Sequence, residues 1–116
     1  TFMLTHWCRD RAAGRLGLAQ TVRALSARPA EVAGLNDRGR IAPGLKADIN
    51  LIDHARLRLL RPHIAFDLPN GERRLDQSTQ GFVATYVAGQ AIVQNDRPTG
   101  ALPGRLVRGA QPAPAC

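Results

Sequence analysis

The 116-residue sequence has little of the features that mark several large classes of protein. It contains two cysteines, Cys8 and Cys116, which is too few for a disulfide framework and fits a reducing compartment. No apolar run approaches the roughly 18 to 20 residues that a membrane span requires. No charged segment followed by an apolar segment marks a signal peptide. These absences predict a cytoplasmic protein without membrane association, and the length predicts one domain with a modest core.

Aromatic residues and lysine are also scarce. The chain has three Phe, one Tyr and one Trp, and Lys46 is the single lysine among sixteen basic residues. The net charge of +7 raises the question of nucleic-acid binding. However, the arginines are spread over the whole length, few rings are available for base stacking, and no helix-turn-helix, zinc-finger or RNP pattern is present. The charge is therefore interpreted as a solvated surface, and nucleic acid is not expected as a partner.

A complete active site is not present among these residues. The three histidines, His6, His54 and His63, form no H-x-H or H-E-x-x-H pattern, and no C-x-x-C occurs. His54 and His63 flank a loop-like stretch, so surface positions are expected for both. Asp48 and Asp53 bracket an apolar segment, but an offset of five residues places them on opposite faces of an extended strand. We expect Asp48 to accept hydrogen bonds from the preceding turn and Asp53 to begin the next turn.

Helical patterns occupy the first third of the chain. Apolar residues recur at helical spacing over residues 1–12 and again over residues 18–25. A further short helix is predicted over residues 29–33, beginning at a proline. Gly34 followed by Leu35 fits a left-handed residue that ends this helix, together with its apolar neighbour.

After Gly39 the pattern becomes that of strands and turns. Pro43-Gly44 fits the centre of a type II turn, and residues 47–53 read as a strand. Residues 82–88 and 91–94 form a predicted hairpin around Gly89-Gln90. Three further segments have weaker signals: an irregular stretch over 54–70, a turn at Asn70-Gly71, and a proline-rich end over 98–116.

Two stretches resemble a known family. GLNDRGRIAPGLKADINLID, residues 34–53, resembles the closing segment of amidohydrolase-superfamily enzymes, in which a G-x-[IL]-x-P-G-x-x-A-D turn leads into a strand. The end of the chain resembles the last hairpin and T-G-x-x-P-G-R element of the N-acyl-D-amino-acid deacylases (D-aminoacylases). LTHWCRDR and DLPNGERRL add to this resemblance, which covers about residues 1–109. The matching positions in the two stretches are Gly39, Ile41, Pro43, Gly44, Ala47 and Asp48, then Thr99, Gly100, Pro103, Gly104, Arg105 and Arg108.

The resemblance implies an α+β fragment: the C-terminal helices of a (β/α)8 barrel (TIM barrel) followed by strands of a small β-sandwich. Residues 1–38 would be barrel helices, residues 39–109 the sandwich portion, and residues 110–116 a disordered tail. The turn containing Pro43, Gly44 and Asp48 would be a structural joint between the two parts.

The resemblance also implies that the parent enzyme hydrolyses the amide bond of N-acyl-D-amino acids or related compounds and binds zinc. No zinc ligand of the family has a counterpart here, so no catalytic or metal residue is predicted and the fragment alone is expected to be inactive. His6 and Arg9 are candidates for the substrate rim, since an arginine suits a substrate carboxylate. The implied partners are the small-molecule substrate and the missing N-terminal part of the same chain.

A freestanding, non-catalytic β-sandwich-like module for binding or subunit interaction is the alternative. The amidohydrolase fragment and the freestanding module differ in how much apolar surface they are predicted to expose. A piece of a barrel should expose apolar residues on the helices within residues 1–38, whereas a freestanding module should not.

Overall fold

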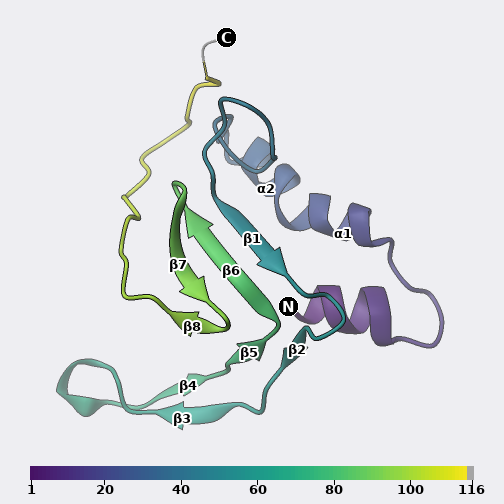
Figure 1. The fold of residues 1–116 in the computed structure, drawn as a ribbon, viewed down its shortest axis with the longest axis vertical. Coiled ribbons are helices and arrows are strands. Elements are labelled where there is room, and N and C mark those ends of the chain that lie inside the picture. The colour runs from purple at the N-terminus through teal and green to yellow at the C-terminus, as the bar shows by residue number, and fades with distance from the viewer. Residues whose placement is uncertain (115–116) are drawn as a thin grey trace.

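The computed structural model describes residues 1–114, in which a short helical layer precedes a set of antiparallel strands (Figure 1). The helical elements are η1 (Met3–Asp10), α1 (Leu18–Leu25), α2 (Ala27–Val32) and the single turn η2 (Pro69–Gly71). The strands are β1 (Ile49–Ile52), β2 (Arg58–Leu59), β3 (His63–Ala65), β4 (Arg74–Asp76), β5 (Thr79–Gln80), β6 (Phe82–Val87), β7 (Gln90–Gln94) and β8 (Arg97–Pro98). Within residues 1–114, no helix combines the length and the apolar character that crossing a membrane requires.

The three predicted helices are present, with changes in type and in one boundary. The first, η1, is a π-helix, and the Arg11 N–H closes it by donating to the His6 carbonyl five residues earlier, at 3.0 Å. The second, α1, has the predicted bounds. The third, α2, begins at Ala27 rather than at Pro29. Proline is tolerated there because the N–H groups of a first helical turn have no partner inside the helix.

The end of α2 has the predicted geometry. Gly34 lies in the left-handed region with φ 69°, and its N–H donates to the Glu31 carbonyl. The Leu35 N–H donates to the Ala30 carbonyl at 2.8 Å. This pair of bonds is the Schellman motif, which satisfies two carbonyls that the helix end leaves free. The chain then turns back so closely that a Cβ on Gly39 would lie 2.5 Å from the Ala30 Cβ.

The main sheet has the antiparallel strand order β1-β6-β7-β8 (Figure 1). In its register, Ile49 of β1 pairs with Tyr86 of β6. The β6–β7 hairpin turns at Ala88 and Gly89, with φ 50° and 80°, and Gln90 already belongs to β7. The prediction of a Gly89-Gln90 turn was therefore wrong by one residue. A two-residue turn with positive φ at both positions matches the twist of the flanking strands, and Ala88 adopts that conformation here.

The weakly patterned stretch after β1 contains structure that the sequence did not predict. Strand β2 pairs with β5, and β3 pairs with β4, to form two small two-stranded sheets. Figure 1 shows β3 and β4 as an arm that projects away from the main sheet. Asn70 and Gly71, with φ 63° and 71°, form the predicted turn at the end of this arm. Strands of two or three residues are too short to produce a recognisable alternation in the sequence.

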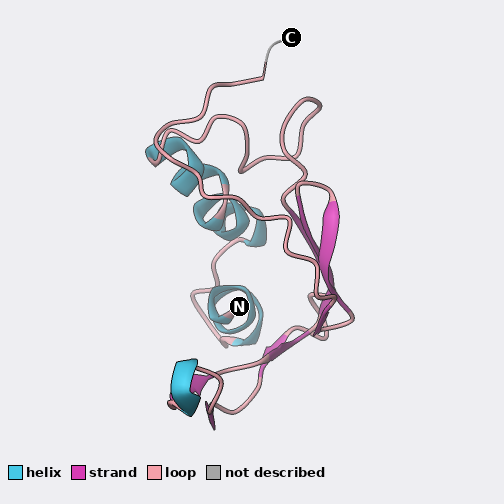
Figure 2. Cartoon of the chain, turned by 90° about the vertical axis from the view of Figure 1, so that its left-hand side faces the viewer, coloured by secondary structure: helices cyan, strands magenta, loops and turns pink. Residues whose placement is uncertain are grey.

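The chain is open and thinly packed. Its radius of gyration is 16.4 Å, whereas about 13 Å is expected for a compact domain of this length. Figure 2 shows the helices on one side of the main sheet. Within residues 1–114 the buried apolar residues are few and mostly small: Ala27, Ala30, Leu57 and Ala84, beside the buried polar residues Thr5 and Thr21. The α+β class is thus confirmed, with a core far smaller than an independent domain of this size would have.

Large apolar side chains are exposed on the helical segment, as predicted for helices that cover part of a barrel. Leu18, Val22 and Leu25 of α1 are 45%, 48% and 51% exposed, although they recur at the spacing of a core-facing stripe. Further along the chain, Gln111 forms a bridge with Leu35, and its N–H donates to the Gly34 carbonyl at 2.9 Å. Gln111, which lies in the predicted disordered tail, thus contacts the end of α2. Residues 115–116, including Cys116, lie outside the described residues.

Candidate functional site

The turn before β1 is a joint that ties the helices to the main sheet. The Leu45 N–H donates to the Ala42 carbonyl at 3.2 Å and Gly44 has φ 82°, as a type II turn at Pro43-Gly44 requires. Asp48 does not accept bonds from this turn, which corrects the prediction. Its Oδ1 accepts the Ala88 N–H at 2.8 Å, because the tip of the β6–β7 hairpin lies against the start of β1.

A cluster of charges closes the same joint. Arg38 donates to both carboxylate oxygens of Asp37, at 2.9 and 3.1 Å, and the Lys46 Nζ lies 2.9 Å from the same carboxylate. The hydrogen bonds from Arg38, followed by those from Lys46, hold the pKa of Asp37 well below its ordinary value. Arg38 also reaches Asp48 at 3.3 Å. All these groups pair with one another, so the joint has a structural role.

Arg9 joins the helical segment to the loop after β1. Its guanidinium donates to both carboxylate oxygens of Asp10, at 2.6 and 3.2 Å. It also donates to three carbonyls of the chain after β1: those of His54, of Ala55 at 3.2 Å, and of Leu57 at 2.9 Å. Its hydrogen bond and charge hold the pKa of Asp10 below its ordinary value. We call Arg9, Asp10, His54, Ala55 and Leu57 the Arg9 clamp.

The loop in the clamp is shaped by Asp53, as predicted. The Asp53 Oδ1 accepts the N–H groups of Ala55 and Arg56, both at 3.1 Å, and so begins a turn. The same turn brings His54 against η1, where its Nε2 lies 3.0 Å from the Leu4 carbonyl. Because a carbonyl only accepts, this nitrogen carries the proton. His54 was predicted at the surface, and it is instead partly buried against η1.

His6 lies in a different environment from Arg9. It is exposed and stacks on Phe2 in parallel, with ring centroids 4.9 Å apart, and it meets the Trp7 ring edge-on at 5.6 Å. The Arg11 guanidinium lies 4.3 Å from the centre of the Trp7 ring, a cation–π arrangement. The two predicted rim residues thus share no partner: His6 belongs to an aromatic row on η1, whereas Arg9 faces the loop.

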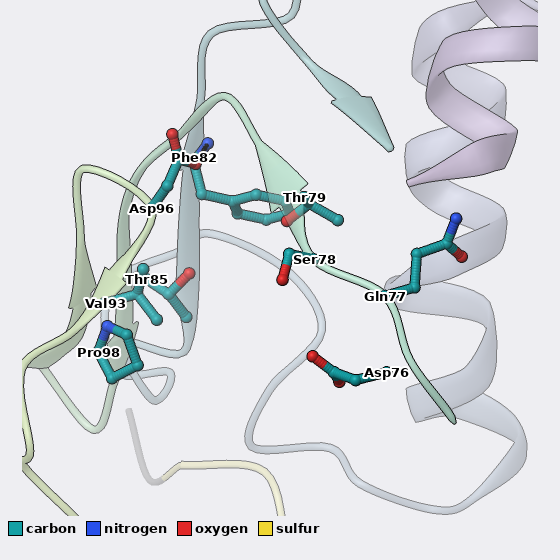
Figure 3. Close-up of a pocket in the computed structure, with 9 residues that line it drawn as sticks. All are labelled: Asp76, Gln77, Ser78, Thr79, Phe82, Thr85, Val93, Asp96 and Pro98. Carbon is teal, nitrogen blue, oxygen red and sulfur yellow. Dashed lines mark hydrogen bonds between the residues drawn. The ribbon is translucent and has the colours of Figure 1, made fainter. Parts of the chain in front are cut away.

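A hollow beside the main sheet involves neither His6 nor Arg9. It has a volume of about 390 Å³ (Figure 3). It is lined by Asp76, Gln77, Ser78, Thr79, Phe82, Thr85, Val93, Asp96 and Pro98. Its two carboxylates already have partners: Asp96 accepts the Phe82 N–H at 2.6 Å, and Asp76 pairs with Arg74 at 2.9 Å. The sequence did not predict this hollow, because it depends on the unpredicted pairing of β3 with β4 and of β2 with β5.

The residues present do not fit a metal ion. Within residues 1–114, no three His, Cys, Asp or Glu side chains come together in a way that could bind one. His63, which is exposed, lies 3.7 Å from the Asp76 carboxylate, and this pair has no third potential ligand beside it in that part of the chain. Zinc chemistry is therefore not assigned to any residue described here.

Comparison with known proteins identifies the family. A family model described as the amidohydrolase family matches residues 1–93, which include the helices, the joint, the Arg9 clamp and all but the last residue of the β6–β7 hairpin. The chain belongs to the amidohydrolase family. Neither the curated proteins nor the solved structures contain a match. Membership supports a hydrolase parent with a small-molecule substrate, in a family whose members generally bind metals.

Proposed function

We propose that this chain is the C-terminal part of a metal-dependent amidohydrolase that hydrolyses the amide bond of N-acyl-D-amino acids or related compounds. The amidohydrolase match runs across both helices and strands, so it supports a single origin for the two parts. The resemblance of the T-G-x-x-P-G-R ending and the H-W element to the D-aminoacylases supports the choice of substrate. In this proposal residues 1–38 are barrel helices, and residues 39–109 belong to a β-sandwich.

The exposed apolar stripe on α1 is the observation that carries the proposal. Leu18, Val22 and Leu25 lie on one helical face, and each is close to half exposed. Apolar residues at this spacing are normally buried against a neighbouring element. The stripe therefore needs a partner outside residues 1–114, and the body of a barrel is the partner that the family supplies.

In the proposed enzyme, this chain and the preceding part of the protein have different roles. Zinc would be held by residues that precede Thr1 in the full protein, since the residues described here do not fit a metal. Of the two predicted rim residues, His6 keeps that proposed role, because its ring is exposed on η1 beside Phe2. Alone, the chain would have no catalytic activity, and the parent would be cytoplasmic.

The test compares the chain alone with the complete reading frame that contains it. Both proteins are assayed with N-acetyl-D-amino acids and with the L enantiomers, and their zinc content is measured. We expect the complete protein to bind zinc and to prefer the D substrates, and the chain alone to do neither. Hydrolysis by the chain alone, or a zinc-loaded complete protein with no amidase activity, would overturn the proposal.

The alternative, a freestanding interaction module, makes the opposite prediction about the isolated chain. It requires a monomer that unfolds cooperatively and has no tendency to aggregate. We expect the isolated chain to aggregate instead, because its apolar stripe is about half exposed and β1 and β8 are edge strands of the main sheet within residues 1–114. Light scattering and thermal unfolding of the isolated chain decide between the two.

A further inference from the structure

We propose that Arg9 is a positioning residue that fixes η1 against the loop of residues 53–57, and that it does not bind the substrate carboxylate. This inference rests on the proposed function, because it assigns a role within that enzyme. A guanidinium has five N–H groups, and five hydrogen bonds leave Arg9 for protein acceptors. No donor remains for a ligand.

The acceptors explain why an arginine stands at this position. Two bonds go to the Asp10 carboxylate, which fixes the plane of the guanidinium. The other three go to carbonyls of His54, Ala55 and Leu57, which point toward η1 from one short loop. A planar, five-donor group can serve this many acceptors at once, whereas a lysine ammonium is a point charge with three donors.

The loop that Arg9 holds is itself fixed to the sheets. The Asp53 N–H donates to the Gly81 carbonyl at 2.9 Å, and Leu57 is fully buried. Gly81, with φ 109°, passes so close that a Cβ there would lie 2.7 Å from the Leu57 Cα. The loop thus offers a rigid surface to η1. The position of η1 relative to the strands is set where Arg9 contacts this surface.

A hydrogen bond from the loop to the start of η1 adds to the positioning role of Arg9. His54 Nε2 donates to the Leu4 carbonyl at 3.0 Å, so loop and helix exchange hydrogen bonds in both directions. Between these two attachments η1 carries His6, which is stacked on Phe2 and exposed. Releasing the clamp would let this aromatic row shift relative to the rest of the protein. Displacements of about 1 Å at a substrate site cost up to about 100-fold in rate.

The experiment uses the complete enzyme and the variants Arg9→Ala, Arg9→Lys and Arg74→Ala. Arg74 is the matched control, since its guanidinium also binds a carboxylate with two bonds, Asp67 at 2.7 Å each, and reaches a second, Asp76. It lies on the β3–β4 arm, away from the clamp. Each variant is assayed well below its unfolding temperature, so that loss of folded protein does not contribute.

Positioning and direct substrate contact affect different kinetic constants. We expect Arg9→Ala to lower kcat by about 10- to 100-fold with little change in KM. Arg9→Lys should not restore activity, and Arg74→Ala should retain it. Hydrogen exchange should increase at residues 3–10 and 53–57 in Arg9→Ala and should not increase there in the control Arg74→Ala.

Three outcomes would overturn the inference: a rise in KM with kcat unchanged, which indicates a lost carboxylate contact; wild-type activity in Arg9→Ala; or an equal loss in Arg74→Ala. These outcomes are distinct from failure of the proposed function, which would appear as an inactive wild-type enzyme.

Discussion

Arg9 and His54 donate hydrogen bonds in opposite directions across the contact between η1 and the loop after β1. The Arg9 guanidinium donates to the backbone carbonyl of His54, and the His54 ring donates to a backbone carbonyl of the helix that carries Arg9, at Leu4. The two residues are 45 positions apart in the sequence. The side chains of Arg9 and His54 thus join the helical segment to the loop after β1.

His54→Ala should weaken this contact without touching Arg9. It removes the hydrogen bond to the Leu4 carbonyl, and a hydrogen bond of this kind contributes about 1 kcal/mol to the free energy of unfolding. Urea unfolding of the complete protein measures the loss. His63→Ala is the control, because the His63 side chain is 54% exposed and its nearest charged partner is 3.7 Å away. An equal effect of both substitutions would contradict the role given to His54.

Gly39→Ala should be more destabilising than Gly100→Ala. Both glycines have a similar backbone, with φ 87° and 84°, so a new Cβ is strained to a similar degree at each. At Gly39 the Cβ would also meet the Ala30 Cβ at 2.5 Å, whereas nothing lies within 4 Å at Gly100. Overpacking of this kind typically costs about 1 to 3 kcal/mol. The difference in free energy of unfolding between the two variants isolates that packing term, and a difference near zero would show that Gly39 does not pack on α2.

Asp37→Asn should change how stability depends on pH. The pKa of Asp37 is held below its ordinary value by Arg38 and Lys46, so the folded state favours the ionised carboxylate. The resulting stabilisation is complete above the unfolded pKa of about 3.9 and is lost as pH falls through the lower folded pKa. We expect the wild-type free energy of unfolding to fall below about pH 4, and that of Asp37→Asn to be lower at neutral pH and to fall less steeply.

Glu72→Gln is the matched control for this acid titration. Glu72 is exposed and takes part in none of the ion pairs found within residues 1–114. Its substitution should leave the pH profile unchanged. Identical profiles for wild type and Asp37→Asn would show that the charge cluster at the joint does not stabilise the fold.

Replacing the apolar stripe with Leu18→Gln, Val22→Gln and Leu25→Gln should have opposite effects in two proteins. In the isolated chain it should reduce aggregation, because the exposed apolar surface is removed. In the complete protein it should lower the melting temperature, because the stripe would then face the barrel. Phe66→Gln is the control, since Phe66 is 70% exposed on the loop between β3 and β4. If the triple variant left the complete protein unchanged, the stripe would not be an internal contact.

Local signals in the sequence were sufficient for part of this fold. The Schellman end of α2 depends on Gly34 and Leu35 alone, and the type II turn depends on Pro43-Gly44. Both follow from the backbone preferences of a few adjacent residues, so both could be predicted. The α1 helix could be predicted because its apolar spacing extends over two turns.

The parts that were missed depend on residues distant in sequence. Asp48 accepts the Ala88 N–H, forty positions away, and no pattern around Asp48 indicates that the hairpin tip lies there. The position of His54 depends on η1, fifty positions earlier. Arg9 was predicted as a candidate for the substrate rim, with a substrate carboxylate as its partner. The loop carbonyls to which it donates could not be predicted from the sequence, because every residue carries a carbonyl.

The bridge between Leu35 and Gln111 has a topological consequence. It brings the chain after the last strand back to the end of α2, so the strand-rich region begins and ends at one place in space. The two ends of this region therefore lie side by side, as those of an inserted unit do. Circular permutation there would need a short connection at the end of α2, and an exchanged region would also have to preserve the loop carbonyls that Arg9 binds.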